Sequence, residues 1–126
     1  MSFEVLTVPR FEKEAKAIGK RQRSLRSDLA VLIDSLEENP FQGDELTPGI
    51  RKIRMAITSK GRGKSGGARV ITYTVVVAEC EGRVYLLSIY DKGDYSTIDI
   101  EAIKKAVEEL KVPPQGEGKV LSLIHI

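Results

Sequence analysis

Apolar residues recur at intervals of three and four over residues 9–19 and again over residues 25–36. This spacing places them on one side of a helix, so each segment is predicted to form an amphipathic helix. Pro9 suits the first turn of the first helix, and Asn39-Pro40 ends the second because the residue before proline avoids the helical conformation. A short basic turn at 20–23 joins the two, which predicts a helical hairpin.

The spacing changes to a period of two after residue 49. Basic Lys52 and Arg54 alternate with apolar Ile53, Met55 and Ile57. Alternation of this kind predicts a strand with one face in the core. The apolar side chains would face the core, and the two basic side chains would project together from the opposite face.

Three other segments are rich in β-branched and aromatic residues and are also predicted to be strands: 3–8, 69–78 and 84–90. The last is apolar along most of its length, which indicates a central strand. The glycine-rich stretch at 58–67 is predicted to be a hairpin loop. It does not have the glycine and lysine spacing of a phosphate-binding Walker loop.

A final helix is predicted to be capped by Ser96 or Thr97 and to end before Pro113. The resulting fold class is α+β, with an N-terminal strand, a helical hairpin, a three-stranded antiparallel meander and a C-terminal helix. We expect the helices to pack on one face of the sheet. One domain is expected over residues 1–112. The tail at 113–126 either adds an edge strand or is foreign to the domain, and the pattern does not determine its order.

Composition excludes several classes of protein. The 126 residues suit a single domain, no apolar run approaches the ~20 residues of a membrane span, and the N-terminus lacks a secretory apolar segment, so we expect a cytoplasmic protein without membrane contact. The one cysteine, Cys80, excludes an internal disulfide and a cysteine zinc cluster. The one histidine, His125, lies in the last two residues, which argues against a histidine-based catalytic triad. We expect no metal and no cofactor.

Positive charge is concentrated in one stretch of the chain. Residues 49–73 carry seven basic residues, and no acidic residue occurs between Glu45 and Glu79. A patch of one sign is typical of proteins that bind a phosphate polymer. The alternative interpretation, an ordinary solvated surface, is common for basic strands and loops. Tyr73, Tyr90 and Tyr95 follow in the same half of the chain, and tyrosines beside cations favour single-stranded RNA, although packing is the more ordinary role for a tyrosine on a sheet, Tyr73 included.

Three segments carry a resemblance to a known family: R-K-I-R-M-A at 51–56, S-K-G-R-G-K-S-G-G-A-R-V-I-T-Y at 59–73 and V-Y-L-L-S-I-Y-D-K-G-D-Y-S at 84–96. Together with the final helix they resemble the RelE/HigB family of toxins from bacterial toxin–antitoxin modules, over about residues 3–110. The family fold is a small sheet with an N-terminal helical hairpin. The elements predicted above agree with it.

The resemblance implies a metal-independent endoribonuclease that cleaves mRNA in the ribosomal A site through attack of the RNA 2′-hydroxyl on the adjacent phosphate. Cations would stabilise the pentavalent phosphate, and a lysine or tyrosine would move protons. By motif position the implied catalytic residues are Lys52, Arg54, Arg69, Lys92 and Tyr95. Contacts to mRNA or ribosomal RNA are expected from Arg51, Lys60, Arg62, Lys64 and Tyr73.

The implied partners are a cognate antitoxin, which would cover the basic site, and RNA of the translating ribosome. Two other functions stay open. A toxin of the related ParE branch would act on gyrase and would not be a nuclease, and that branch generally lacks so dense a set of cations. A non-enzymatic RNA-binding module would bind with the same salt dependence but would not cleave.

Overall fold

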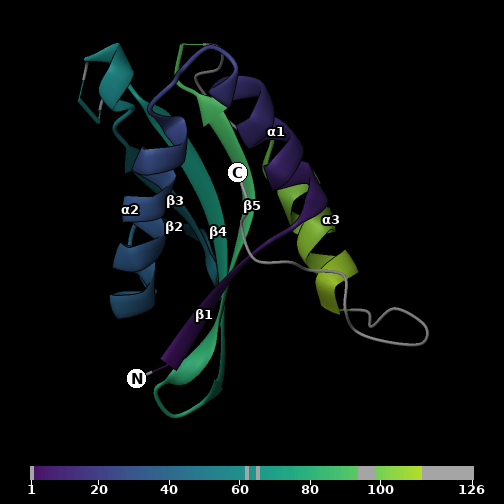
Figure 1. Cartoon of the computed structure of the whole chain (residues 1–126). Coiled ribbons are helices and arrows are strands. Elements are labelled where there is room, and N and C mark those ends of the chain that lie inside the picture. The colour runs from purple at the N-terminus through teal and green to yellow at the C-terminus, as the bar shows by residue number, and fades with distance from the viewer. Residues whose placement is uncertain (1, 62, 65, 94–98, 112–126) are drawn as a thin grey trace.

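The computed structural model describes residues 2–61, 63–64, 66–93 and 99–111 (Figure 1). Within them the chain forms three α-helices, one short 3-10 helix (η1) and five strands, so the α+β class is confirmed. In chain order the elements are β1 (Ser2–Thr7), α1 (Pro9–Gly19), α2 (Leu25–Glu38), β2 (Asp44–Thr47), β3 (Ile50–Met55), η1 (Thr58–Lys60), β4 (Ala68–Ala78), β5 (Glu81–Asp91) and α3 (Ile100–Lys111).

The strands form one mixed sheet in the order β1-β5-β4-β3-β2. β3, β4 and β5 pair antiparallel in chain order, as the meander prediction required. The prediction was incomplete at both edges. β2 pairs antiparallel with β3, and β1 pairs parallel with β5. β2 was missed because four residues are too few to show a strand alternation, and the direction of β1 depends on pairing that local sequence does not encode.

The helical hairpin forms where its apolar stripes predict it. Leucines at α2 positions 25, 29, 32 and 36 are buried, as are Phe11, Ala15 and Ile18 of α1. Glu14 of α1 accepts hydrogen bonds from the Ser88 hydroxyl at 2.7 Å and the Ile89 amide at 3.1 Å. The pairing of β1 with β5 stops at Leu86, so α1 covers the edge of β5 beyond that point.

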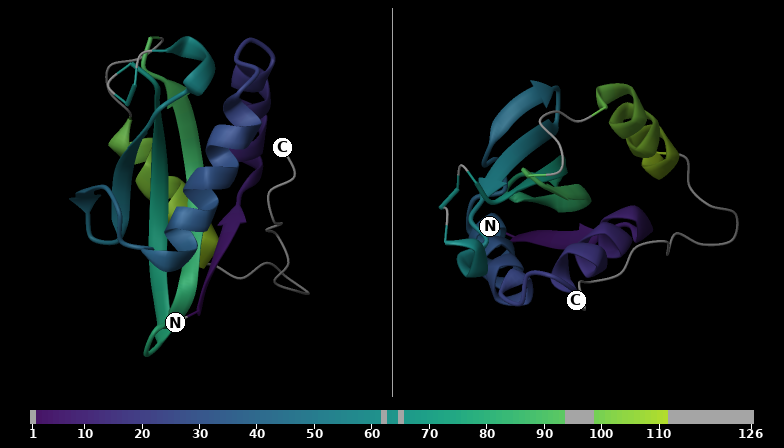
Figure 2. Two further views of the ribbon diagram at one scale, coloured as in Figure 1. Left: turned by 60° about the vertical axis from the view of Figure 1, so that its left-hand side comes forward. Right: turned by 90° about the horizontal axis from the view of Figure 1, so that it is seen from above.

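The expectation that all helices pack on one face was wrong. In both views of Figure 2, α3 lies on the side of the sheet away from α2. Neighbouring strand residues point to opposite faces, and Val70 and Ile71 of β4 are both fully buried, so both faces of the central strands need cover. Ile103 and Val107 of α3 are buried in providing it.

α3 begins later than predicted. Its cap is Asp99, whose Oδ1 accepts hydrogen bonds from the amides of Glu101 at 3.0 Å and Ala102 at 3.3 Å. The carboxylate thereby satisfies amides that have no partner inside the helix. Ser96 and Thr97, the predicted caps, lie outside the described residues, as do Tyr95, Arg62 and the tail.

Gly67 is the residue that lets β4 begin close to the end of β3. A side-chain carbon added there would collide with the Met55 carbonyl oxygen and the Ala56 backbone. The Gly67 carbonyl also accepts a hydrogen bond from the Lys92 amide at 2.9 Å. Gly67 therefore helps to fix the register of the strand that carries Arg69.

Candidate nucleic-acid interface

The sheet register brings Arg54, Arg69 and Tyr90 into one row across three strands. Arg54 of β3 lies opposite Arg69 of β4, and Arg69 lies opposite Tyr90 of β5. Directly opposed residues share a face of the sheet, and neighbouring strands are about 4.8 Å apart. Two guanidinium groups and a phenol from distant parts of the sequence are thus neighbours on one face.

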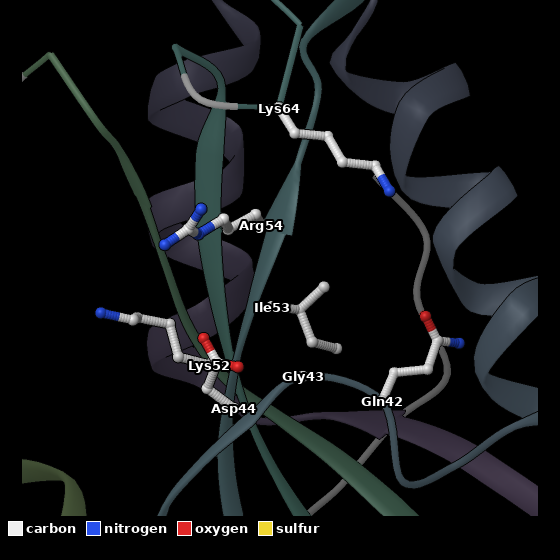
Figure 3. A pocket seen from close by; sticks show the side chains of 7 residues that line it. All are labelled: Gln42, Gly43, Asp44, Lys52, Ile53, Arg54 and Lys64. Atoms are coloured by element: carbon white, nitrogen blue, oxygen red, sulfur yellow. The ribbon is translucent and has the colours of Figure 1, made fainter.

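Lys52 extends this row along β3, on the same face as Arg54 and opposite Asp44 of β2. Figure 3 shows the Lys52 and Arg54 side chains pointing to one side of β3 and the Ile53 side chain to the other. These three side chains help to line a hollow of about 450 Å³. It is lined by Gln42, Gly43, Asp44, Lys52, Ile53, Arg54 and Lys64.

Burial divides these cations. Arg54 is exposed and Lys52 is half-buried, so both reach solvent. Arg69 is only 5% exposed and does not line the hollow, although it lies opposite Arg54 in the sheet. Its Nη1 donates hydrogen bonds to the carbonyl oxygens of Lys64 at 3.0 Å and Ala68 at 3.3 Å. These bonds fix the orientation of the guanidinium and tie the glycine-rich loop to the site.

Tyr90 is buried beside Arg69. Burial raises the pKa of the Tyr90 phenol above its ordinary value of 10.0, and the nearby Arg69 charge opposes the rise without cancelling it. The phenol is therefore protonated at neutral pH. It can support Arg69 as a neutral neighbour and is not a proton acceptor.

The structure places the other predicted catalytic residues less completely. Lys92 directly follows β5. The hydrogen bond from its backbone amide to the Gly67 carbonyl holds it at the end of the sheet where β4 begins. Tyr95 cannot be placed, because it lies outside the described residues, as does Arg62 of the RNA-binding set.

Lys60 and Lys64 of the glycine-rich loop take different positions. The Lys64 side chain lines the hollow beside Arg54. The Lys60 ammonium instead lies 2.7 Å from Oδ1 of Asp91, a carboxylate that is 5% exposed, and Arg21 contacts Oδ2 of the same residue at 3.6 Å. Lys60 therefore holds the loop onto the sheet. Its predicted RNA contact remains a prediction.

Arg51 and Tyr73 do not join the row. Arg51 lies on the opposite face of β3 from Lys52, where it contacts Glu45 at 3.7 Å and sits over the Phe41 ring at 5.3 Å. Tyr73 shares the face of Arg69 but lies opposite Ile50, toward the other end of β3, and stacks on Tyr85 with ring centroids 6.2 Å apart. Packing is thus one role of Tyr73.

Two further members of the site, Asp44 and Gln42, went unnoticed in the sequence. Both lie between the second predicted helix and the strand that carries Lys52, where no strand was predicted. The Gln42 side chain is held by hydrogen bonds to the Ser35 hydroxyl at 2.6 Å and the Asn39 carbonyl at 3.1 Å. Only the pairing of β2 with β3 brings these residues beside Lys52. The one signal in the sequence was that the acidic residues at 44–45 lie only a few positions before the basic strand, where they could pair with its cations.

Within the described residues, no group of three or more His, Cys, Asp or Glu side chains is arranged to hold a metal ion. None of the helices in this part of the chain is long and apolar enough to cross a membrane. No protein-family model matches the chain. A functional assignment therefore depends on the residues and their geometry.

Proposed function

We propose that this protein is the toxin of a toxin–antitoxin module, a metal-independent endoribonuclease of the RelE/HigB type that cleaves mRNA on the translating ribosome. The single observation that carries the proposal is the set of three basic residues, Lys52, Arg54 and Arg69, on one face of β3 and β4. The sheet-edge hollow beside them is open to solvent and polar. The resemblance of segments 51–56, 59–73 and 84–96 to that family supports the same conclusion.

These cations suit the chemistry of RNA cleavage by internal attack. An O2′–P bond forms while the P–O5′ bond breaks, which leaves a 2′,3′-cyclic phosphate and a 5′-hydroxyl. Negative charge builds up on the phosphate oxygens in the transition state. Lys52 and Arg54, which reach solvent, contact these oxygens, and the buried Arg69 adds positive charge from the neighbouring strand. Fixed donors of this kind favour the transition state because they need no reorganisation.

The reaction also moves two protons. The 2′-hydroxyl loses one, and the leaving O5′ gains one. Asp44 is the carboxylate among the residues that line the hollow, and it lies opposite Lys52, so we assign it as the acceptor of the first proton. The Lys52 ammonium can donate the second.

Cleavage of mRNA in a reconstituted translation system tests the proposal. Addition of the purified chain should create new mRNA 5′ ends, seen by primer extension, only when ribosomes translate the message. Cuts in naked RNA would instead identify a ribosome-independent nuclease. An uncut message together with inhibited gyrase supercoiling would assign the chain to the ParE branch.

The proposed site also defines what the antitoxin must do. Because the basic face is open, an antitoxin inhibits the enzyme by covering Lys52 and Arg54 with an acidic segment. Binding of the antitoxin and of RNA should then be mutually exclusive. Competition between the two for the purified chain is the corresponding measurement.

A further inference from the structure

The turn between α1 and α2 forms a second basic surface that the proposed catalytic site does not use. Lys20, Arg21 and Arg23 in this turn are exposed. With Gly19, Gln22 and Ser59 they line a hollow of about 310 Å³. Clustered basic residues around a polar hollow are suited to a phosphate group.

Hydrogen bonds hold this turn against η1, at the base of the glycine-rich loop. The Ser59 hydroxyl donates to the Gln22 side-chain oxygen at 3.0 Å, and the Ser59 amide donates to the Ser24 hydroxyl at 2.8 Å. Figures 1 and 2 show the turn and η1 at the same end of the molecule. The two basic segments are therefore one surface, although about 40 residues separate them in the sequence.

Charge on this surface is unbalanced. Asp91 is buried and neutralises part of the charge of Lys60 and Arg21, and Asp28 accepts hydrogen bonds from the Thr58 amide at 2.9 Å and the Thr58 hydroxyl at 2.6 Å. Among the residues that line or support this surface in the described part of the chain, five cations face these two carboxylates, an excess of three positive charges. The cations are Lys20, Arg21, Arg23, Lys60 and Lys64.

The candidate catalytic hollow extends toward this surface. A depression of about 360 Å³ between α2 and β3 contains Arg54 and Lys64, which also line the catalytic hollow, and extends to Asp28 and Thr58. Thr58 is the chain neighbour of Ser59, which lines the hollow at the turn. A strand of nucleic acid bound at Arg54 can follow this depression to Thr58, whose neighbour Ser59 lines the hollow at the turn.

We infer that the α1–α2 turn is a second phosphate-binding site, in which Lys20 and Arg23 contact the backbone of an RNA strand whose scissile phosphate lies at Lys52 and Arg54. The choice of RNA as the ligand rests on the proposed function. The site would lengthen the bound strand and raise affinity without taking part in the chemistry.

Fluorescence anisotropy on the full chain tests this inference. The probes are labelled 2′-O-methyl RNAs, which have no attacking hydroxyl, of about four and about 12 nucleotides, the range a small single-strand site covers. The test variant is Lys20→Gln with Arg23→Gln. The control, Lys104→Gln with Lys105→Gln, changes exposed lysines on α3.

The turn variant should bind the long probe roughly tenfold more weakly and the short probe equally well. The slope of log affinity against log salt for the long probe should fall by about 1.4, from two lost phosphate contacts at about 0.7 each. The control should retain the wild-type slope. Equal long-probe affinity in the turn variant and the control would overturn the inference.

Two further outcomes separate this inference from the proposed function. If the wild type cleaves mRNA but the turn variant binds the long probe normally, the inference fails and the nuclease stands. If the wild type never cleaves but binds the long probe through the turn, the nuclease fails and the second site stands.

If the turn variant loses binding to a polyglutamate peptide but not to RNA, the site belongs to an acidic protein, which also overturns the inference.

Discussion

At the residue scale, burial separates the cations of the site into two kinds. Arg54 is exposed, whereas Arg69 is buried and donates to two backbone carbonyls. Replacing Arg69 by alanine therefore changes stability as well as chemistry, since loss of a buried donor leaves those carbonyls without it. Arg54 and Lys52 are the positions where activity can be changed with the fold intact.

We expect Arg54→Ala to lower the cleavage rate by about 10²–10³-fold, the usual effect of losing one donor to a developing anion. Its thermal unfolding midpoint should stay near that of the wild type because the side chain is exposed. Arg83→Ala on β5 is a matched control, since Arg83 is also an exposed strand arginine. Equal rates for the two variants in an mRNA cleavage assay would remove Arg54 from the site.

Asp44→Asn separates a proton acceptor from a residue that merely reduces positive charge. If Asp44 accepts the 2′-hydroxyl proton, the Asp44→Asn variant should cleave RNA about 10²-fold more slowly than the wild type. It should still bind 2′-O-methyl RNA at least as tightly as the wild type. If Asp44 only reduces the charge, both cleavage and binding should rise. Glu45→Gln controls for charge because Glu45 follows Asp44 on β2 but contacts Arg51 on the other face.

At the element scale, one buried carboxylate holds three elements together. Asp91 at the end of β5 contacts Lys60 of η1 and Arg21 of the α1–α2 turn. Burial opposes ionisation of Asp91, but hydrogen bonds from Lys60 and the Gly93 amide and the charges of Lys60 and Arg21 outweigh it. The pKa of Asp91 consequently lies below its ordinary value of 3.8.

Asp91→Asn should lower the free energy of unfolding by roughly 2–4 kcal/mol near neutral pH, because it leaves Lys60 without its buried partner. A lowered folded-state pKa stabilises the folded state above the unfolded pKa, and this contribution disappears as pH falls through the folded-state pKa. Urea unfolding should thus show a constant difference between wild type and variant around neutrality, which shrinks below about pH 3.8. A difference independent of pH would show that Asp91 does not act through its charge.

Gly67→Ala should destabilise the protein by about 1–3 kcal/mol, because the added carbon collides with the backbone of Met55 and Ala56. It should also reduce cleavage, since the start of β4 positions Arg69. Gly66→Ala is the neighbouring control. Full activity with an unchanged unfolding midpoint in Gly67→Ala would show that this close approach does not set the register.

The sequence alone predicted the helices and central strands because their apolar spacing is local. It also predicted that Lys52 and Arg54 share a face, which follows from alternation. It could not predict that Asp44 lies beside Lys52, that Lys60 forms an ion pair with Asp91, or that α3 covers the face of the sheet away from α2. The first depends on the pairing of the short strand β2 with β3, and the other two depend on contacts between segments far apart in the chain. Local apolar spacing does not encode such contacts.

At the scale of the whole molecule, the positive charge is gathered along one path. It extends from Lys52 and Arg54 on the sheet, past Lys64, to the α1–α2 turn. The fold supplies the rigid part of this path, because β3 and β4 hold the basic residues of the candidate site in register while Asp91 holds the loop and the hairpin. An extended RNA strand is the ligand whose shape and charge match this arrangement.

The most direct test of the account is primer extension on mRNA in a reconstituted translation system, comparing the wild type with the double variant Lys52→Ala and Arg54→Ala. The account predicts new 5′ ends within the translated region for the wild type, none for the double variant, and none for either protein without ribosomes. Identical cleavage by the two proteins would contradict the assignment of the site. An intact message at all concentrations of wild type that bind RNA would contradict the proposal that this protein is a nuclease.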